Sequence, residues 1–279
     1  MRNIRTIARM AAFNLRQLFT CASTYVGLAV GLFTINLYLD PVRQCCVEYG
    51  VGVSPFQLFA YLTSKPYPHC LLFCGWIITI CNTPLLTGLQ TNVLVRVGRG
   101  KWLLGQIAFI SISAILYWAA IVALTALVFI GYIGDFGEWG RVLRTLESSN
   151  AYAILSKVIA NYAVVPAFTM AFFTNILAAI ALGYLIFNIN MASRRMVGAA
   201  VALIFPILEL AFTGLGIPGK YLYISIVSLC NLSILDVWHV TYMPTPEYAF
   251  TFLICVAAVL GASCYFSFRR SSFMVRESV

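Results

Sequence analysis

The run Trp102–Ile133, WLLGQIAFISISAILYWAAIVALTALVFIGYI, contains 32 consecutive residues without a charged side chain. A helix needs about 20 apolar residues to cross a hydrocarbon core of about 30 Å, so this run predicts a transmembrane helix that tilts or projects beyond the bilayer. The composition agrees: of 279 residues, 61% are apolar and 10% are charged, and the mean hydropathy is +0.90. A soluble globule needs a more polar exterior. The sequence therefore predicts an all-α integral membrane protein.

Similar apolar runs recur along the chain and predict one transmembrane domain over residues 1–279. Residues 21–268 should contain six spans, at Tyr25–Leu39, Cys70–Gln90, Trp102–Ile133, Ile159–Phe187, Met196–Gly214 and Ala249–Phe268. A further apolar stretch, Tyr221–Leu235, is too short for a comfortable crossing and precedes Asp236. It predicts a re-entrant or interfacial segment on the outer side, between spans five and six.

The orientation follows from the positions of lysine and arginine. Six crossings place on one side 12 of the 18 basic residues, namely Arg2, Arg5, Arg9, Arg16, Arg96, Arg99, Lys101, Arg194, Arg195, Arg269, Arg270 and Arg276. The basic side of a membrane protein is cytoplasmic, so both termini should be cytoplasmic in a cell membrane. This sorting and attraction to anionic membrane lipid account for the net charge of +9 without a nucleic-acid partner.

The amino-terminal segment 1–20 predicts an interfacial amphipathic helix. At 100° per residue its arginines form one stripe, opposite the apolar residues Ile4, Ile7, Ala11, Leu15 and Leu18. A secretory signal would have a shorter basic region and a small-residue cleavage site, so we expect this segment to be retained. Residues 269–279 should form a cytoplasmic tail.

Two short basic turns should lie on the inner side. The turn after span two contains Arg96, Arg99 and Lys101, and the turn after span four contains Arg194 and Arg195. Neither turn has room for a domain, but together they could seat a soluble partner. The alternative is that any membrane hairpin has a basic inner turn, whatever it binds.

This layout resembles the type-2 ABC transporter permeases, which are mostly exporters. The shared features are the interfacial helix, six spans, two inner turns and an outer re-entrant segment, and the run Arg96–Gln106 is similar to the stretch where the family's first coupling element enters span three. The resemblance implies that two copies, or one copy and a paralogous permease, form the pathway. It also implies that ABC ATPase subunits dock on the inner turns, at Arg96, Arg99, Lys101, Arg194 and Arg195.

The chain lacks the residues that an ATPase needs. A P-loop requires Gly-x-x-x-x-Gly-Lys-Ser/Thr, and neither Gly100–Lys101 nor Gly219–Lys220 is followed by Ser or Thr. We therefore expect this chain to be no enzyme and to hold no cofactor, with ATP and magnesium bound by the partner subunit.

Polar residues inside the spans are the pathway candidates. Glu209 follows Pro206 by three residues, and a carboxylate at membrane depth is costly enough to indicate function. Asn82 and Asn175 are further candidates, although hydrogen bonding between helices is the commoner role of such amides. For Glu209 the alternative is a carboxyl near the outer end that is protonated or bonded to a neighbouring helix. Pro84, Pro166 and Pro206 predict kinks.

Metal and nucleophile chemistry has no sequence support. The two histidines, His69 and His239, lack a second ligand at helical spacing, and each reads as an outer interfacial residue. The nine cysteines include no Cys-x-x-Cys pair. Cys45 or Cys46 could pair with Cys70, because all three should lie on the oxidising side.

Two functions remain open on the sequence alone. The first is a permease subunit of an ATP-driven exporter. The second is a non-transport membrane protein, either an assembly scaffold or an intramembrane enzyme with unrecognised active residues. The substrate cannot be read, because lipid-facing helices have the same apolar composition whatever they carry.

Overall fold

A computed structural model describes residues 2–84, 97–134, 138–140, 142–144, 153–193, 197–214, 219–239 and 241–270. These residues form α-helices and short 3₁₀ helices, and they contain no β-strand beyond a single bridge between Val53 and Ile133. The elements are α1 (Arg2–Thr20), α2 (Ala22–Tyr49), α3 (Pro55–Ser64), α4 (Pro66–Ile80), α6 (Arg99–Val128), η1 (Ile130–Tyr132), α8 (Ala153–Asn161), α9 (Val164–Ser193), α10 (Gly198–Gly214), η3 (Gly219–Ile224), η4 (Ser228–Cys230) and α11 (Pro246–Arg270).

Four of these helices are long and apolar enough to cross a membrane, namely α2, α6, α9 and residues 246–268 of α11. Helices α4 and α10 are also apolar but shorter, with 15 and 17 residues. The prediction of an all-helical protein is confirmed, and the four long helices fit a membrane-embedded chain. Because two of the six expected spans fall short of this length, the six crossings stay a prediction.

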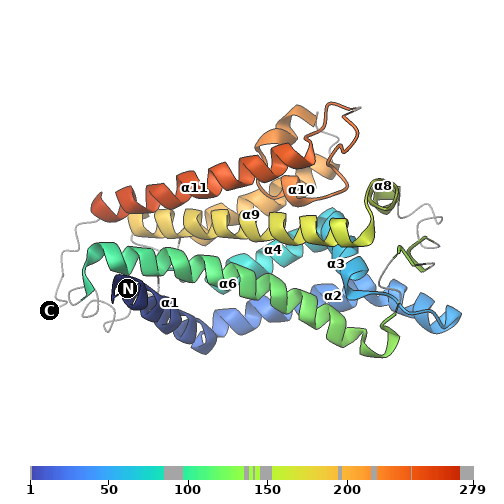
Figure 1. Ribbon diagram of the computed structural model, residues 1–279, viewed down its shortest axis with the longest axis horizontal. Coiled ribbons are helices and arrows are strands. Elements are labelled where there is room, and N and C mark those ends of the chain that lie inside the picture. Colours follow the sequence, from blue (N-terminus) through green and yellow to red (C-terminus); the bar gives the residue numbers. More distant parts are fainter. Residues whose placement is uncertain are drawn as a thin grey trace.

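The helices run back and forth along the long axis of the molecule (Figure 1). Helix α1 begins at the same end as α6, and α9 and α11 finish there. Helices α3 and α8 lie in the opposite half. We call the end where α1 and α6 begin the basic end, because it carries Arg99 and Lys101.

Several predicted span boundaries are wrong. The first span does not stop at Leu39: α2 continues through Pro41 to Tyr49 and ends at Gly50, whose φ of 61° gives the left-handed C-cap that favours glycine. In the region of the predicted second span, helix α4 begins at Pro66 and ends at Ile80, before Pro84. Pro84 is therefore no kink within a helix.

The predicted fourth span, Ile159–Phe187, is two helices. The chain leaves helical geometry at residues 162–163, between α8 and α9, and α9 then continues to Ser193. Pro166 lies in the first turn of α9, where its missing N–H leaves no intrahelical bond unmade, so it does not kink the helix. Pro206 does lie inside a helix, α10, as expected.

Glycines bring α2 and α4 close together. A Cβ added at Gly27 would lie 2.1 Å from Thr79 Oγ1 and 2.4 Å from the carbonyl oxygen of Gly75. One added at Gly31 would lie 2.5 Å from the side chain of Ile121 on α6. The spacing of Gly27 and Gly31 is that of a small-residue packing face in membrane helices. The start of α2 therefore packs on the end of α4, and the two helices are antiparallel.

Helix α1 covers the segment predicted to be an amphipathic helix, and it packs against the first half of α6. Its buried residues include Met10 and Ala11, and a Cβ added at Gly105 of α6 would lie 2.7 Å from Met10 Cβ. Arg5, Arg9 and Arg16 are exposed. The amphipathic pattern therefore reports a real packing face, although Ile4 of the predicted apolar stripe is exposed.

Residues 219–239 are not a continuous helix. They contain η3 and η4, and residues 225–232 are buried. The Cys230 thiol donates to the carbonyl of Thr174 on α9, at 3.3 Å. This segment thus packs its irregular backbone inside the protein, and its position relative to a membrane stays a prediction.

Candidate functional site

Four buried polar side chains from distant parts of the chain meet between α4, α9 and α10. His69 lies in the second turn of α4, Asn175 on α9, Glu209 on α10, and Asn231 directly after η4. Each of the four is 0% exposed. We call these residues the buried polar cluster.

His69 is the centre of the cluster. Its Nδ1 lies 2.8 Å and 2.9 Å from the two carboxylate oxygens of Glu209, and its Nε2 lies 2.8 Å from Asn175 Oδ1. Both ring nitrogens therefore have a polar partner. The imidazole also packs edge-on against Phe73, with ring centroids 5.0 Å apart.

The orientation of Asn175 fixes one proton of His69. Asn175 Nδ2 donates to the carbonyl of Ala171 at 2.7 Å, so its Oδ1 is the atom that faces the imidazole. An amide oxygen only accepts hydrogen bonds, and therefore Nε2 of His69 must carry a hydrogen. The opposite amide orientation would place two acceptors, Asn175 Oδ1 and the Ala171 carbonyl, face to face.

One further proton lies between His69 Nδ1 and the Glu209 carboxyl group. If Nδ1 carries it, an imidazolium faces a carboxylate; if the carboxyl group carries it, a neutral acid donates to Nδ1. Both arrangements give the pair a net charge of zero. Such neutrality is what a fully buried pair requires, because an unpaired charge in the interior is very costly.

Asn231 completes the cluster from the irregular segment. Its Nδ2 donates to Glu209 Oε1 at 3.1 Å, and its Oδ1 accepts bonds from the backbone N–H and the hydroxyl of Ser233. The amide is therefore oriented by its own loop. The cluster attaches residues 219–239 to α10 and α4.

Two of the three predicted pathway residues, Glu209 and Asn175, belong to this cluster, and the third does not. Asn82 lies beyond the other end of α4, where its Nδ2 donates to Ser23 Oγ at 3.4 Å and its Oδ1 accepts from Cys81. Asn82 therefore connects the start of α2 with the end of α4. The bonding of Glu209 and Asn175 to neighbouring helices matches the helix–helix alternative weighed for such residues.

The side chain of His69 is buried inside the protein and bonded on both nitrogens, and its position at the outer membrane interface stays a prediction. A sequence signal existed: His69 and Glu209 are both polar residues in apolar segments near the predicted outer side. His239 is exposed and has a positive φ of 54°.

The structure describes the predicted disulfide cysteines and only some of the predicted docking residues. All nine cysteines are free, so neither Cys45 nor Cys46 is bonded to Cys70. Within the described residues no group of three or more metal-ligand side chains occurs. Arg99 is exposed and Lys101 is half-buried in the first turn of α6, whereas Arg96, Arg194 and Arg195 lie outside the described residues.

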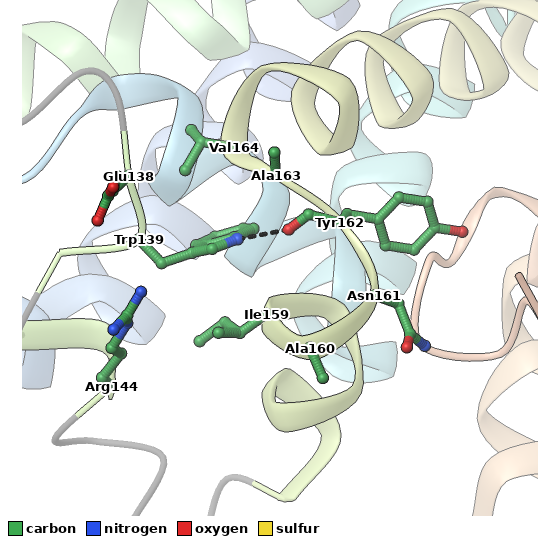
Figure 2. A pocket seen from close by; sticks show the side chains of 9 residues that line it. All are labelled: Glu138, Trp139, Arg144, Ile159, Ala160, Asn161, Tyr162, Ala163 and Val164. Carbon is green, nitrogen blue, oxygen red and sulfur yellow. Dashed lines mark hydrogen bonds between the residues drawn. The ribbon is translucent and has the colours of Figure 1, made fainter.

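A shallow hollow of about 300 Å³ lies beside α8, in the half of the bundle away from the basic end. Figure 2 shows the Trp139 ring beside the chain that joins α8 to α9, and its indole N–H donates to the carbonyl of Tyr162 at 2.7 Å. Glu138 and Arg144 are exposed at its edge. The Trp139 bond holds residues 138–140 against the chain between α8 and α9, and we assign it a structural role.

No protein-family model, curated protein or solved structure matches the chain.

Proposed function

We propose that this chain is the permease subunit of an ATP-driven exporter of the ABC type. In this proposal it lies in the cell membrane with both termini in the cytoplasm, and a separate subunit binds and hydrolyses ATP. The observation that carries the proposal is the alternating course of the apolar helices, which gathers the starts of α1 and α6 and the ends of α9 and α11 at one end (Figure 1).

The charges at the basic end support a docking role. Helix α6 begins with Arg99 and Lys101 and has no acidic residue in its first turn. Cations at a helix amino terminus oppose the helix dipole and cost about 0.3–1 kcal/mol each. Stability alone does not favour this placement, so contact with an acidic surface or with lipid headgroups is the better explanation.

Exposed arginines of α1 extend the same basic surface. Arg5, Arg9 and Arg16 are exposed, while the opposite face of α1 packs on α6. A force applied to α1 would therefore reach α6 directly. In the proposed mechanism, closure of the ATPase subunits moves the basic end and rearranges the spans. Arg96, Arg194 and Arg195 belong to the same proposed docking surface by their positions in the sequence.

The proposal is tested by purifying the tagged chain from its own membrane in mild detergent. We expect a P-loop ATPase subunit to co-purify, and the preparation to hydrolyse ATP. The double change Arg99→Glu and Lys101→Glu should lower recovery of that subunit at least about tenfold, because it reverses two charges of the docking surface.

Lys157→Glu is the matched control. Lys157 is exposed on α8, in the opposite half of the molecule, so the same charge reversal there should leave the ATPase bound. Equal recovery from all three proteins would contradict the docking role. A preparation without any ATPase would instead favour a scaffold or an intramembrane enzyme.

A further inference from the structure

The buried polar cluster joins four chain segments at a mechanically weak point of α10. Pro206 lies one turn before Glu209 and has no N–H, so the carbonyl of Ala202 lacks its intrahelical partner. The half of α10 that carries Glu209 therefore depends on contacts outside the helix. His69 and Asn231 supply those contacts through the carboxyl group of Glu209.

The strength of these contacts depends on the number of protons that the pair holds. With one proton between Nδ1 of His69 and the carboxyl group of Glu209, the pair is neutral and bonded. A second proton would leave an imidazolium beside a neutral acid, with a net charge of +1. Loss of the shared proton would leave a carboxylate facing the lone pair of Nδ1, with a net charge of −1. Either change leaves an uncompensated charge in the interior.

We propose that the His69–Glu209 pair is a proton-operated latch. It holds α10 and residues 219–239 against α4 and α9 while it keeps one shared proton, and it releases them when it gains or loses one. The ligand of this site is the proton itself. The latch belongs to this chain alone and does not depend on the proposed export function.

The neighbouring titratable groups are thiols, phenols and the ammonium group of one lysine. The thiols of Cys70 on α4 and Cys230 on η4 lie within electrostatic range of the Glu209 carboxyl group, and Tyr38 on α2 lies within such range of Cys70. Helix α9 contributes the uncharged Asn175. The ammonium group of Lys65, just before α4, donates to the Tyr61 hydroxyl at 2.6 Å. The latch therefore responds to its own two groups.

The direction of the response follows from proton counting. In water a glutamic acid side chain titrates near pH 4.3 and a histidine side chain near pH 6.5. Between these two values the carboxyl group of the open pair is ionised and its imidazole carries the proton. The open and closed states then hold the same number of protons, so opening does not depend on pH. Above about pH 6.5 opening releases one proton and should become about tenfold easier per pH unit. Below about pH 4.3 opening takes up one proton and becomes easier as the pH falls.

The test measures how fast Cys230 reacts with N-ethylmaleimide in the purified full-length chain. Cys230 is 0% exposed and adjoins Asn231, so its reaction reports opening of the cluster. Each rate is divided by that of a free thiol at the same pH. Cys255 is exposed on α11 and serves as the internal reference. From about pH 6.5 to about pH 8.5 we expect the corrected Cys230 rate to rise about 100-fold.

Two conservative variants change this profile in opposite ways. In Glu209→Gln the amide donates to Nδ1 without a shared proton, so the rate should be flat above about pH 6.5 and should rise as the pH falls below it. In His69→Gln the acid must keep its own proton to stay neutral, so the alkaline rise should begin about two pH units lower, near pH 4.3.

Ser228→Ala is the packing control. Ser228 bonds to Ser225 inside the same buried segment, at 2.7 Å between hydroxyl oxygens, but it does not titrate. Its removal should raise the Cys230 rate without changing the shape of the profile. The latch is refuted if Glu209→Gln and the wild type give parallel profiles, since the cluster would then be ordinary packing.

Discussion

The two ends of the bundle differ in whether their ionisable side chains are exposed or buried. At the basic end Arg99 is exposed, as are Arg5, Arg9 and Arg16 of α1, and the helix dipole of α6 disfavours its cations. In the other half, His69 and Glu209 are fully buried and hydrogen-bonded to each other, with 2.8 Å between Nδ1 and Oε1. The comparison separates exposed residues, for which we propose a partner, from buried residues that bond to each other, and substitutions should distinguish the two groups by their cost in stability.

The largest effect should come from Glu209→Ala. This change leaves the imidazole of His69 buried without its partner, and breaking one side of a buried pair costs about 3–5 kcal/mol. The measurement is the thermal unfolding midpoint in detergent, compared with Glu209→Gln, which preserves shape and bonding. If both variants unfold at the wild-type temperature, the pair does not hold the helices together.

A smaller difference should separate two amides that the sequence treats alike. Asn175→Ala removes the acceptor of His69 Nε2 and should cost about 1–3 kcal/mol, because a buried donor is left unsatisfied. Asn82→Ala removes a 3.4 Å bond from a half-buried side chain and should cost less than about 1 kcal/mol. Chemical or thermal unfolding of the two variants would rank them, and equal losses would contradict a special role of the cluster.

The smallest effect on stability is expected for Arg99→Ala. The side chain is exposed at the start of α6, so the free energy of unfolding should change by less than about 0.5 kcal/mol. Loss of the guanidinium also relieves its unfavourable position at the helix dipole. A drop of more than about 2 kcal/mol in an unfolding experiment would show that Arg99 has a structural role instead.

The sequence predicts the elements better than their ends. Long apolar runs are sufficient to find α2, α6, α9 and α11, because apolar length is a local property. The signal for the true end of α2 is also local, since Gly50 supplies a left-handed cap nine residues after Pro41, but the apolar run that set the predicted boundary stops at Leu39, before Asp40. The capping box of α3, with Ser54 and Gln57, is another local signal.

The cluster could be predicted only in part. Glu209 and Asn175 stand out as polar residues in apolar helices, and this isolates them as candidates. Their partner His69 is 140 residues from Glu209, and no local pattern connects them. Only the packing of α4 against α10, which brings these helices together, shows that the histidine and the carboxylate form one pair.

Nitrogen NMR of the two histidines tests the central claim most directly, namely that His69 and Glu209 share one proton. With only His69 and His239 in the chain, ¹⁵N-histidine labelling gives two sets of ring signals, assigned with a His239→Gln variant. We predict that His69 Nε2 stays protonated and that the His69 signals hold constant from about pH 5 to about pH 7, while the signals of free histidine in the same buffer shift. A His69 signal that moves with pH in step with free histidine would contradict the shared proton.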